Sequence, residues 1–257
     1  MFLSIVSGSS GNCTLVSHKN TTILVDCGLS CKKMEQALSC LGVDPCGIDG
    51  ILVTHEHSDH TKGIGVASRK YSIPVYATLK THQQMEIGNL HEKNIKYISP
   101  DLDFEIGDIG ITPFSIPHDA ANPVAYNIFY NNIKVSVATD IGKMNDYIMS
   151  HLKGSLAVLL ESNHDIDMLK NGKYPMILKK RILSDYGHLS NNSAAETALE
   201  LAKTGTKHLM LGHLSNENNT PRSAFYATAK MLTENGVDLK SDLALTVASR
   251  YEVTKFR

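Results

Sequence analysis

The chain has 257 residues, of which 42% are hydrophobic and 20% charged, so it is long enough and apolar enough to bury a core. Its net charge of −1 excludes a strong global attraction to nucleic acid, so a polyanionic substrate would need a local basic patch or bound metal ions. No apolar run is long enough to cross a bilayer and the first residues lack the basic segment of a secretory signal, so we expect a cytoplasmic protein without a membrane partner.

Short β-branched runs dominate the beginning of the chain. Strands are predicted at 2–6, 13–17 and 21–26, and a helix is predicted over 31–41 with Gly42 closing it. Five cysteines lie in this region, in an odd number and without a C-x-x-C pair, so we expect reduced thiols buried as small hydrophobes. They are Cys13, Cys27, Cys31, Cys40 and Cys46.

Four later apolar runs share one feature, a polar residue at the carboxyl end that can bind a metal or transfer a proton. They cover 51–55, 135–140, 156–162 and 208–213. Such runs belong inside a layered α/β structure, which binds its ligands at the carboxyl ends of strands. Helices are predicted over 193–205 and over 223–236, with Pro221 ahead of the second. No linker or internal repeat is apparent, so we expect one domain over 1–257, with two packed sheets flanked by helices.

The strongest motif is THEHSDH at 54–60, directly after a predicted buried strand. His55 and His57 are two residues apart and project to the same side of an extended backbone, and Asp59 and His60 follow in the turn that opens the next helix. Imidazole nitrogens and carboxylate oxygens suit zinc, manganese or iron. Four such side chains within six residues predict a metal site rather than a solvated turn.

This motif resembles the H-x-H-x-D-H signature of the metallo-β-lactamase superfamily, and the other elements of that signature follow in the expected order. They are Asp26 in ILVDCG, His118 in SIPHDA, Asp140 in VSVATDIG and His213 in HLMLGHLS. The resemblance implies an αββα sandwich with the site at one edge. It also implies two divalent metal ions per chain, either zinc or manganese, with iron as a third option.

The resemblance also implies a role for each of these residues. His55, His57 and His118 would hold one ion, Asp59, His60 and His213 would hold the other, and Asp140 would bridge the two. Asp59 is expected to take part in catalysis as well, and Asp26 is expected to orient the His-rich loop.

Two further motifs lie between Asp140 and His213. GHLSN at 187–191 precedes an Ala-rich helix, as does the short His motif that protonates the leaving group in ribonuclease Z-like phosphodiesterases. His188 is therefore the candidate general acid. ESNHD at 161–165 resembles a second short segment of those enzymes, so Glu161 and His164 are candidates either for shaping the site or for a structural role.

The whole pattern resembles most closely the YycJ/WalJ branch of the superfamily, which is associated with DNA exonuclease activity. This implies a metal-dependent phosphodiester hydrolase with DNA as its substrate, acting from duplex ends. Lactam hydrolysis is not expected, because the thiol-using β-lactamases carry Cys where Asp140 stands. A non-catalytic metal-binding module would need a missing ligand, and a flavodiiron protein would carry an attached flavin domain.

Two enzymatic alternatives stay open, a phosphodiesterase of small cyclic phosphates and an RNA-processing enzyme similar to ribonuclease Z. A basic track near the site would favour DNA. The candidates are Lys179, Lys180 and Arg181 before GHLSN, and Lys62, Arg69 and Lys70 after THEHSDH. The alternative for both clusters is an ordinary solvated helix face. The sequence leaves the oligomeric state open.

Overall fold

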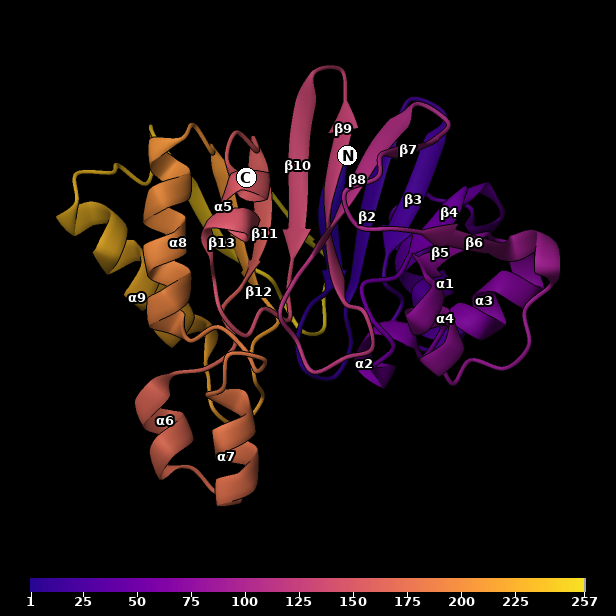
Figure 1. Cartoon of the computed structure of the whole chain (residues 1–257). Coiled ribbons are helices and arrows are strands. Elements are labelled where there is room, and N and C mark those ends of the chain that lie inside the picture. Colours follow the sequence, from indigo (N-terminus) through magenta and orange to yellow (C-terminus); the bar gives the residue numbers. More distant parts are fainter. Residues whose placement is uncertain (257) are drawn as a thin grey trace.

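The computed structural model describes residues 1–256 and is built on two seven-stranded β-sheets packed face to face, with helices on the outer face of each (Figure 1). The first sheet contains, in spatial order, β14 (Thr254–Lys255), β1 (Phe2–Val6), β2 (Cys13–His18), β3 (Thr21–Val25), β4 (Gly50–Leu52), β5 (Val75–Thr78) and β6 (Ile95–Ile98). The second contains β13 (Ala244–Val247), β12 (His208–Gly212), β11 (Ala157–Glu161), β10 (Ile133–Ala138), β9 (Val124–Tyr130), β8 (Ile109–Ser115) and β7 (Phe104–Ile106).

Each sheet joins an antiparallel half to a parallel half. In the first sheet, β14, β1, β2 and β3 pair antiparallel, whereas β3, β4, β5 and β6 pair parallel. In the second, β7 to β10 pair antiparallel and β10 to β13 pair parallel. Strands β8, β10, β11 and β12 therefore point the same way, and the loops that follow them emerge at one edge of the sheet.

Helices cover both sheets, and their ends follow local capping signals. The helices are α1 (Cys31–Cys40), α2 (Ser58–Thr61), α3 (Ile64–Tyr71), α4 (Leu79–Gln84), α5 (Asp146–Leu152), α6 (Ile166–Asn171), α7 (Met176–Ile182), α8 (Asn191–Lys203) and α9 (Pro221–Glu234), with short 3-10 turns at Pro45–Gly47 and Glu92–Asn94. Ser190 caps α8 by accepting from the Ser193 amide, and Thr220 caps α9, which starts with Pro221. The three helices predicted at 31–41, 193–205 and 223–236 are confirmed with small shifts at their ends.

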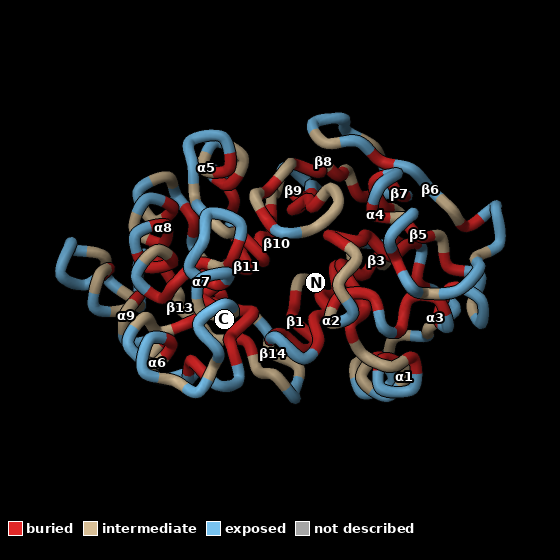
Figure 2. Tube along the Cα trace, turned by 60° about the horizontal axis from the view of Figure 1, so that its bottom comes forward, coloured by how far each residue is buried: buried red, intermediate tan, exposed pale blue. Residues whose placement is uncertain are grey.

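Three apolar layers hold this arrangement together. One lies between the first sheet and helices α1 and α3, and another lies between the second sheet and helices α5, α8 and α9. The third joins the inner faces of the two sheets, where Val25 and Leu52 of the first meet Tyr126 and Val137 of the second. The Tyr126 hydroxyl donates to the Val53 carbonyl across this interface at 2.6 Å. Burial follows the same layers, since the central strands are mostly buried, whereas edge strands such as β6 and the outer faces of the helices are exposed (Figure 2).

The predicted sandwich of two sheets flanked by helices is confirmed, with one local difference at the His-rich motif. The strand predicted over 51–55 ends at Leu52, because the carboxylate of Asp26 accepts the Thr54 amide at 2.9 Å and the backbone leaves the sheet there. His55 therefore lies in a loop, while Asp59 and His60 lie inside α2.

The cysteines carry free thiols, as expected, but only three of them are buried. Burial as small hydrophobes is confirmed for Cys13, Cys27 and Cys31. It is wrong for Cys40 and Cys46, which are exposed at the end of α1 and in a 3-10 turn. Among residues 1–256, no helix is both long and apolar enough to cross a membrane.

Candidate metal centre

The seven candidate metal ligands come together at one edge of the sandwich. They come from the loop after β4 (His55, His57), from α2 (Asp59, His60), and from the loops after β8 (His118), β10 (Asp140) and β12 (His213). Five of them are buried, and His57 and Asp59 are half-buried. Residues up to 158 positions apart in the sequence thus share one small volume because the strand ends converge at this edge.

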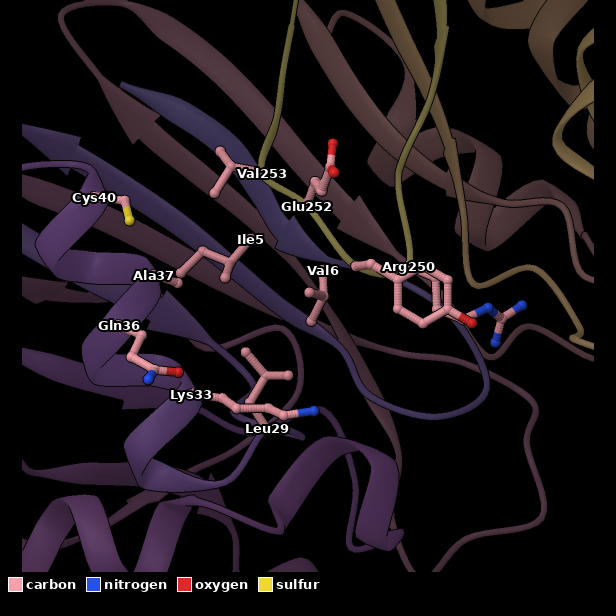
Figure 3. Close-up of a pocket in the computed structure, with 11 residues that line it drawn as sticks. Ile5, Val6, Leu29, Lys33, Gln36, Ala37, Cys40, Arg250, Glu252 and Val253 are labelled. Carbon is pink, nitrogen blue, oxygen red and sulfur yellow. The ribbon is translucent and has the colours of Figure 1, made fainter.

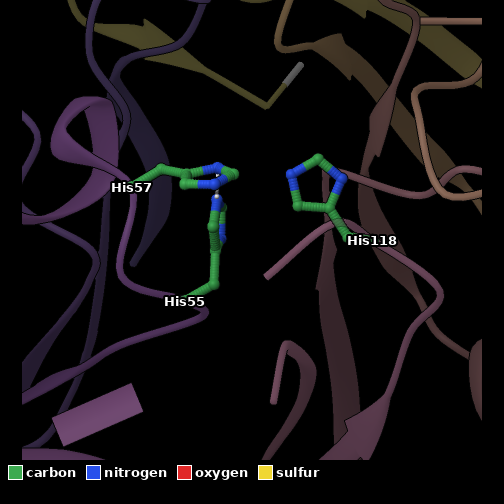
Figure 4. A group of neighbouring side chains, drawn as sticks. All are labelled: His55, His57 and His118. Atoms are coloured by element: carbon green, nitrogen blue, oxygen red, sulfur yellow. Dashed lines mark hydrogen bonds between the residues drawn. The ribbon is translucent and has the colours of Figure 1, made fainter. Parts of the chain in front are cut away.

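One group of three consists of His55, His57 and His118, whose ligand atoms lie within 4.8 Å of one another. The rings point toward one another from both sheets (Figure 4). His55 Nε2 and His57 Nδ1 are 3.0 Å apart. Two nitrogens bound to the same zinc at about 2.0–2.1 Å in tetrahedral geometry would be separated by roughly 3.3 Å. The observed spacing therefore fits two ligands of one ion.

A second group consists of Asp59, His60 and His213, again with ligand atoms within 4.8 Å. Asp59 Oδ2 lies 3.3 Å from His213 Nε2 and 3.5 Å from His60 Nε2. Asp140 stands between the two groups. Its Oδ2 is 3.2 Å from His60 Nε2, and its Oδ1 is 3.8 Å from His118 Nε2. One carboxylate thus contacts both groups.

Three candidate histidines direct Nε2 into this volume because their Nδ1 atoms are bound on the opposite side, and this orientation fits a metal. The Nδ1 atoms of His60, His118 and His213 lie 2.7–3.1 Å from Asp26, the Gly187 carbonyl and Glu161, all of which can only accept. Each neutral ring therefore keeps its lone pair on Nε2. Within the described part of the chain, His118 Nε2 and Asp140 Oδ2 are buried without a hydrogen-bond partner. Buried polar atoms of this kind call for a ligand or an ion.

The electrostatics of the cluster also favour a cation. Burial lowers the pKa of His213, but Asp140, Asp59 and Glu161 outweigh it and raise that pKa to about 10. Burial works against ionisation of Asp140, yet the neighbouring His213 and His60 hold its pKa well below the usual range. The site thus holds several buried carboxylates whose negative charge favours a bound cation. Without a metal ion, protonated histidines balance that charge.

Asp26 and Thr54 orient the His-rich loop from behind. Asp26 accepts from the Thr54 amide at 2.9 Å and from its hydroxyl at 2.8 Å, and it holds His60 Nδ1 at 2.7 Å. Thr54 Oγ1 lies 3.0 Å from His55 Nδ1. One acidic residue thus fixes a ring of the second group directly and, through Thr54, contacts a ring of the first. This is the position expected for Asp26.

Three site residues adopt the left-handed backbone conformation that non-glycine residues rarely take. Asp26, Asp140 and His213 have φ of 60°, 61° and 53°, each immediately or almost immediately after a strand. Asp and His tolerate this region better than most residues, and such conformations concentrate at functional sites. The turn they make directs the side chain from the strand end into the cluster.

The N-terminal loop at 7–12 closes the site from the side of the first sheet, and sequence reasoning missed its two contacts. Ser7 Oγ accepts from the His213 amide at 2.8 Å. Asn12 Nδ2 lies 3.1 Å from His60 Nε2, and the Asn12 amide donates to the Asp59 carbonyl at 2.8 Å. The Ser- and Gly-rich composition of this loop was the available signal, but nothing in it points to the metal ligands.

Glu161 links the candidate general acid to a candidate metal ligand. Its Oε1 lies 2.9 Å from His188 Nδ1 and 2.8 Å from His213 Nδ1, and its Oε2 accepts from the amides of Ile141 and Leu189 at 2.9 Å each. Burial would raise the pKa of Glu161, but His188 and the two imidazole hydrogen bonds lower it to about 2. The carboxylate thus accepts four hydrogen bonds, and this geometry suits a residue that orients the two histidine rings.

The two imidazoles that contact Glu161 lie in two copies of one pentapeptide, GHLSN. His188 belongs to the copy at 187–191 and His213 to the copy at 212–216. Sequence analysis found no repeat and passed over this one. The segment after Glu161 lies between the two copies. The Asn163 amide donates to the Leu189 carbonyl in one copy, and the Ser162 amide donates to the Gly212 carbonyl in the other. His188 is the more accessible of the two rings, with 18% of its side chain exposed against 2% for His213.

His164, the remaining candidate of the ESNHD motif, is buried behind this arrangement. Within residues 1–256, neither of its ring nitrogens has a hydrogen-bond partner. Burial lowers its pKa to about 4, so the ring is neutral at ordinary pH. Its backbone carbonyl accepts from the Asn191 amide at 2.8 Å, which ties the ESNHD segment to the start of α8.

The two predicted basic clusters differ in their relation to the site. Arg181 pairs with Asp119, the neighbour of His118, and lowers its pKa despite partial burial. Lys179 instead donates to the Lys170 carbonyl at 2.7 Å. In the other cluster, Arg69 donates to the Ile87 carbonyl and Lys70 pairs with Glu35 at 3.0 Å, as on an ordinary helix face. Arg181 of the α7 cluster therefore reaches toward the metal ligands, whereas Arg69 and Lys70 make their contacts elsewhere.

A separate cavity of about 460 Å³ lies between α1 and the segment at 250–253. Leu29, Lys33 and Ala37 point into it from one side and Glu252 and Val253 from the other (Figure 3). Among the described residues, none of the candidate metal ligands lines it. The candidate metal ligands thus lie at the strand ends and away from this cavity.

Comparison with known proteins agrees with this geometry. The family model described as the beta-lactamase superfamily domain matches residues 21–214, which contain every candidate metal ligand. The chain belongs to the metallo-β-lactamase superfamily. Exodeoxyribonuclease YycJ of Bacillus anthracis is 42% identical over 238 residues, covering 91% of this chain and 90% of that protein. Exodeoxyribonuclease WalJ of Streptococcus pneumoniae is 38% identical over 244 residues, covering 92% and 91%.

Solved structures share the architecture at low sequence identity. Zn(2+)-bound PqqB from Methylobacterium extorquens superposes with a TM-score of 0.71 at 14% identity, covering 99% of both chains. The metallo-beta-lactamase fold protein YhfI from Bacillus subtilis has a TM-score of 0.68 at 17% identity, covering 99% of this chain and 98% of its own. At these identities the likeness shows the fold alone. It is the αββα sandwich expected from the sequence.

Proposed function

We propose that this protein is a metal-dependent phosphodiester hydrolase that degrades DNA from duplex ends. The observation that carries the proposal is the pair of three-ligand groups joined by Asp140, with the partly buried ring of His188 at their side. The relatives named exodeoxyribonucleases, which align over nine tenths of the chain, supply the substrate class. The free thiols fit a reducing compartment, which supports a cytoplasmic location.

In this proposal, His55, His57 and His118 hold one divalent ion, and Asp59, His60 and His213 hold the other. Asp140 contacts both. Zinc and manganese suit the mixed nitrogen and carboxylate donors. A pair of such ions acts as a Lewis acid toward phosphoryl oxygens and activates water at neutral pH. The protein's own contribution is to fix the rings, through Asp26 for His60, the Gly187 carbonyl for His118 and Glu161 for His213.

His188 is proposed to protonate the departing oxygen of the cleaved diester. Its Nδ1 lies 2.9 Å from Glu161, so Nδ1–H is donated to the carboxylate in either charge state of the ring. In the imidazolium form the second proton is on Nε2, which is the proton that can leave. Glu161 holds the ring in one orientation. His188 thus supplies a proton without being needed to hold a metal.

Variants of the two GHLSN histidines test this assignment. His188→Ala is expected to lower turnover of bis-p-nitrophenyl phosphate by about 10²–10⁴-fold while metal content stays near wild type. His213→Ala is expected to lose metal as measured by elemental analysis. Chelation should abolish activity in the wild type, and zinc or manganese should restore it. Metal loss in the His188 variant, or activity that survives chelation, would contradict the proposed roles.

The DNA substrate is tested separately with long substrates. A linear duplex should be shortened progressively, a closed circle should resist, and the rate should fall as salt rises because DNA binding releases counterions. Lys180→Ala combined with Arg181→Ala should reduce DNA digestion and its salt dependence while sparing the small diester. Lys179 is left in place because it ties α7 to α6. Intact duplex together with rapid cleavage of cyclic nucleotides would replace DNA by a small-molecule substrate.

A further inference from the structure

Helices α6 and α7 form a hairpin that projects from the body of the molecule. In Figure 1 they stand below the sandwich, on the same side as α2, which carries Asp59 and His60. The hairpin leaves the second sheet after β11 and returns at His188. Both of its ends are therefore at the candidate metal centre, since Glu161 ends β11 and bonds to His188.

The hairpin combines positive charge with exposed apolar side chains. Residues 166–184 carry five cations and one acid, in a chain whose net charge is −1. At the start of α7, Met176 is 64% exposed and Ile177 is 85% exposed. Ile177 contributes nothing to the core at that exposure. Exposed apolar side chains on a basic element are unfavourable in water. Nucleic acid can contact both features, because its phosphates pair with the cations and its base faces pack against the apolar side chains.

The order of these residues along α7 places the apolar tip outward and the cation inward. Arg181 pairs with Asp119 beside His118, so this end of α7 is at the metal centre. Ile177 precedes Arg181 by four residues, which is about 6 Å along a helix at 1.5 Å per residue. Base pairs in duplex DNA are stacked at about 3.4 Å, so the tip stands roughly two base-pair steps away from the Arg181 position. This spacing matches a short unpaired strand between the tip and the site.

We infer that the α6–α7 hairpin separates the strands at a duplex end, with Met176 and Ile177 packing against the outermost base pair. The inference rests on the proposed DNA function and deepens it. Five of the seven candidate metal ligands are buried, and a flush duplex end brings two backbones to one small site. Parting the terminal pairs lets one strand reach the ligands while Lys180 and Arg181 hold its phosphates. The apolar tip covers the base face that this opening exposes, as apolar side chains do when they enter a base step.

The test compares the double substitution Met176→Ser and Ile177→Ser with the wild type on three DNA substrates of the same sequence. These are a flush duplex, a duplex with a few unpaired nucleotides at its end, and the single strand. We expect the variant to digest the flush duplex at least about tenfold more slowly, since unstacking a step costs a few kcal/mol. On the pre-opened duplex and the single strand it should match the wild type within twofold. Leu102→Ser, which alters an equally exposed apolar residue in the turn between β6 and β7, should change none of the three rates.

Each contrary result has a distinct meaning. Equal loss on all three substrates would make the tip a general binding element, and no loss on the flush duplex would leave it without this role; either outcome overturns the inference. A change of oligomeric state in the variant, measured by light scattering, would show instead that the tip contacts a second copy of the chain. If the wild type cleaves bis-p-nitrophenyl phosphate but neither form of DNA, the proposed DNA function is wrong and the inference falls with it.

Discussion

Replacement of Glu161 by Gln tests whether one buried carboxylate sets the roles of two histidines. The carboxylate accepts four hydrogen bonds, from the rings of His188 and His213 and from two backbone amides. Gln has the same shape, but only its oxygen accepts. If that oxygen keeps the backbone amides, the NH₂ group faces the two Nδ1 atoms. Each ring must then give up the Nδ1 proton, which moves to Nε2.

The expected losses of metal affinity and turnover follow from what the substitution does to each ring. A proton on Nε2 of His213 blocks the atom that faces Asp59, and loss of such an orienting partner costs about 10–100-fold in metal affinity. His188 loses the carboxylate that accepts its Nδ1 proton and orients its ring, so we expect turnover to fall by about 10²–10⁴-fold. The two charge-assisted hydrogen bonds are worth about 1.5–3 kcal/mol each, so the free energy of unfolding should fall by several kcal/mol at most.

The assay measures metal content, turnover of the small diester and urea unfolding on the same preparations. Glu56→Gln is the matched control. Glu56 lies in the His-rich loop and accepts the Ala121 amide at 2.7 Å, a bond that the Gln oxygen can keep. The reasoning is refuted if Glu161→Gln retains wild-type metal affinity and turnover, or if Glu56→Gln is equally damaged. In the first case the orientation of both rings would depend on other contacts.

Three other substitutions probe the support of the site. Asp26→Asn should weaken metal binding by about 10–100-fold, measured by chelator competition, because the amide cannot accept from both Thr54 and His60. Gly28→Ala should unfold at clearly lower urea concentration, since its Cβ would lie 1.7 Å from the Asp59 carbonyl, whereas Gly47→Ala has open space and should be neutral. In chelated protein, His164→Leu should reduce the amount by which the free energy of unfolding falls as the pH is lowered. The pKa of His164 is about 4 in the folded protein and about 6.5 in the unfolded chain, so the unfolded chain binds a proton first as the pH falls. The free energy of unfolding of the wild type should therefore drop by about 1.4 kcal/mol by pH 5.5. An unchanged profile would contradict this.

The sequence predicted the position of most site residues because they follow strands. Apolar runs that end in His or Asp identify the strand ends, and parallel strands bring those ends to one edge. THEHSDH, Asp140 and His213 could be found in this way, since each lies within or directly after an apolar run that predicts a strand, whereas His118 was identified through the resemblance to the superfamily. The same reasoning gave the layers of the fold, because both-face apolar strands require helices on their outer side.

Other contacts could not be predicted because they depend on how the two sheets pack. Ser7 reaches His213 across 206 positions, and no local pattern encodes that distance. The ion pair between Asp119 and Arg181 likewise depends on where α7 lies. The boundary of β4 was wrong for a related reason. Its end is set by a side chain from the neighbouring strand, Asp26, which takes the next backbone amide.

The repeated pentapeptide shows that surroundings, not local sequence, assign the two histidines their roles. His213 follows β12 in a left-handed turn and is buried against Asp59 and Asp140. His188 follows α7, and its amide donates to the Ile182 carbonyl at 3.1 Å. A Cβ at Gly187 would lie 2.2 Å from that same carbonyl, so only glycine lets the chain pass so close to the end of α7. The position of the proposed general acid is therefore fixed to the end of the basic hairpin.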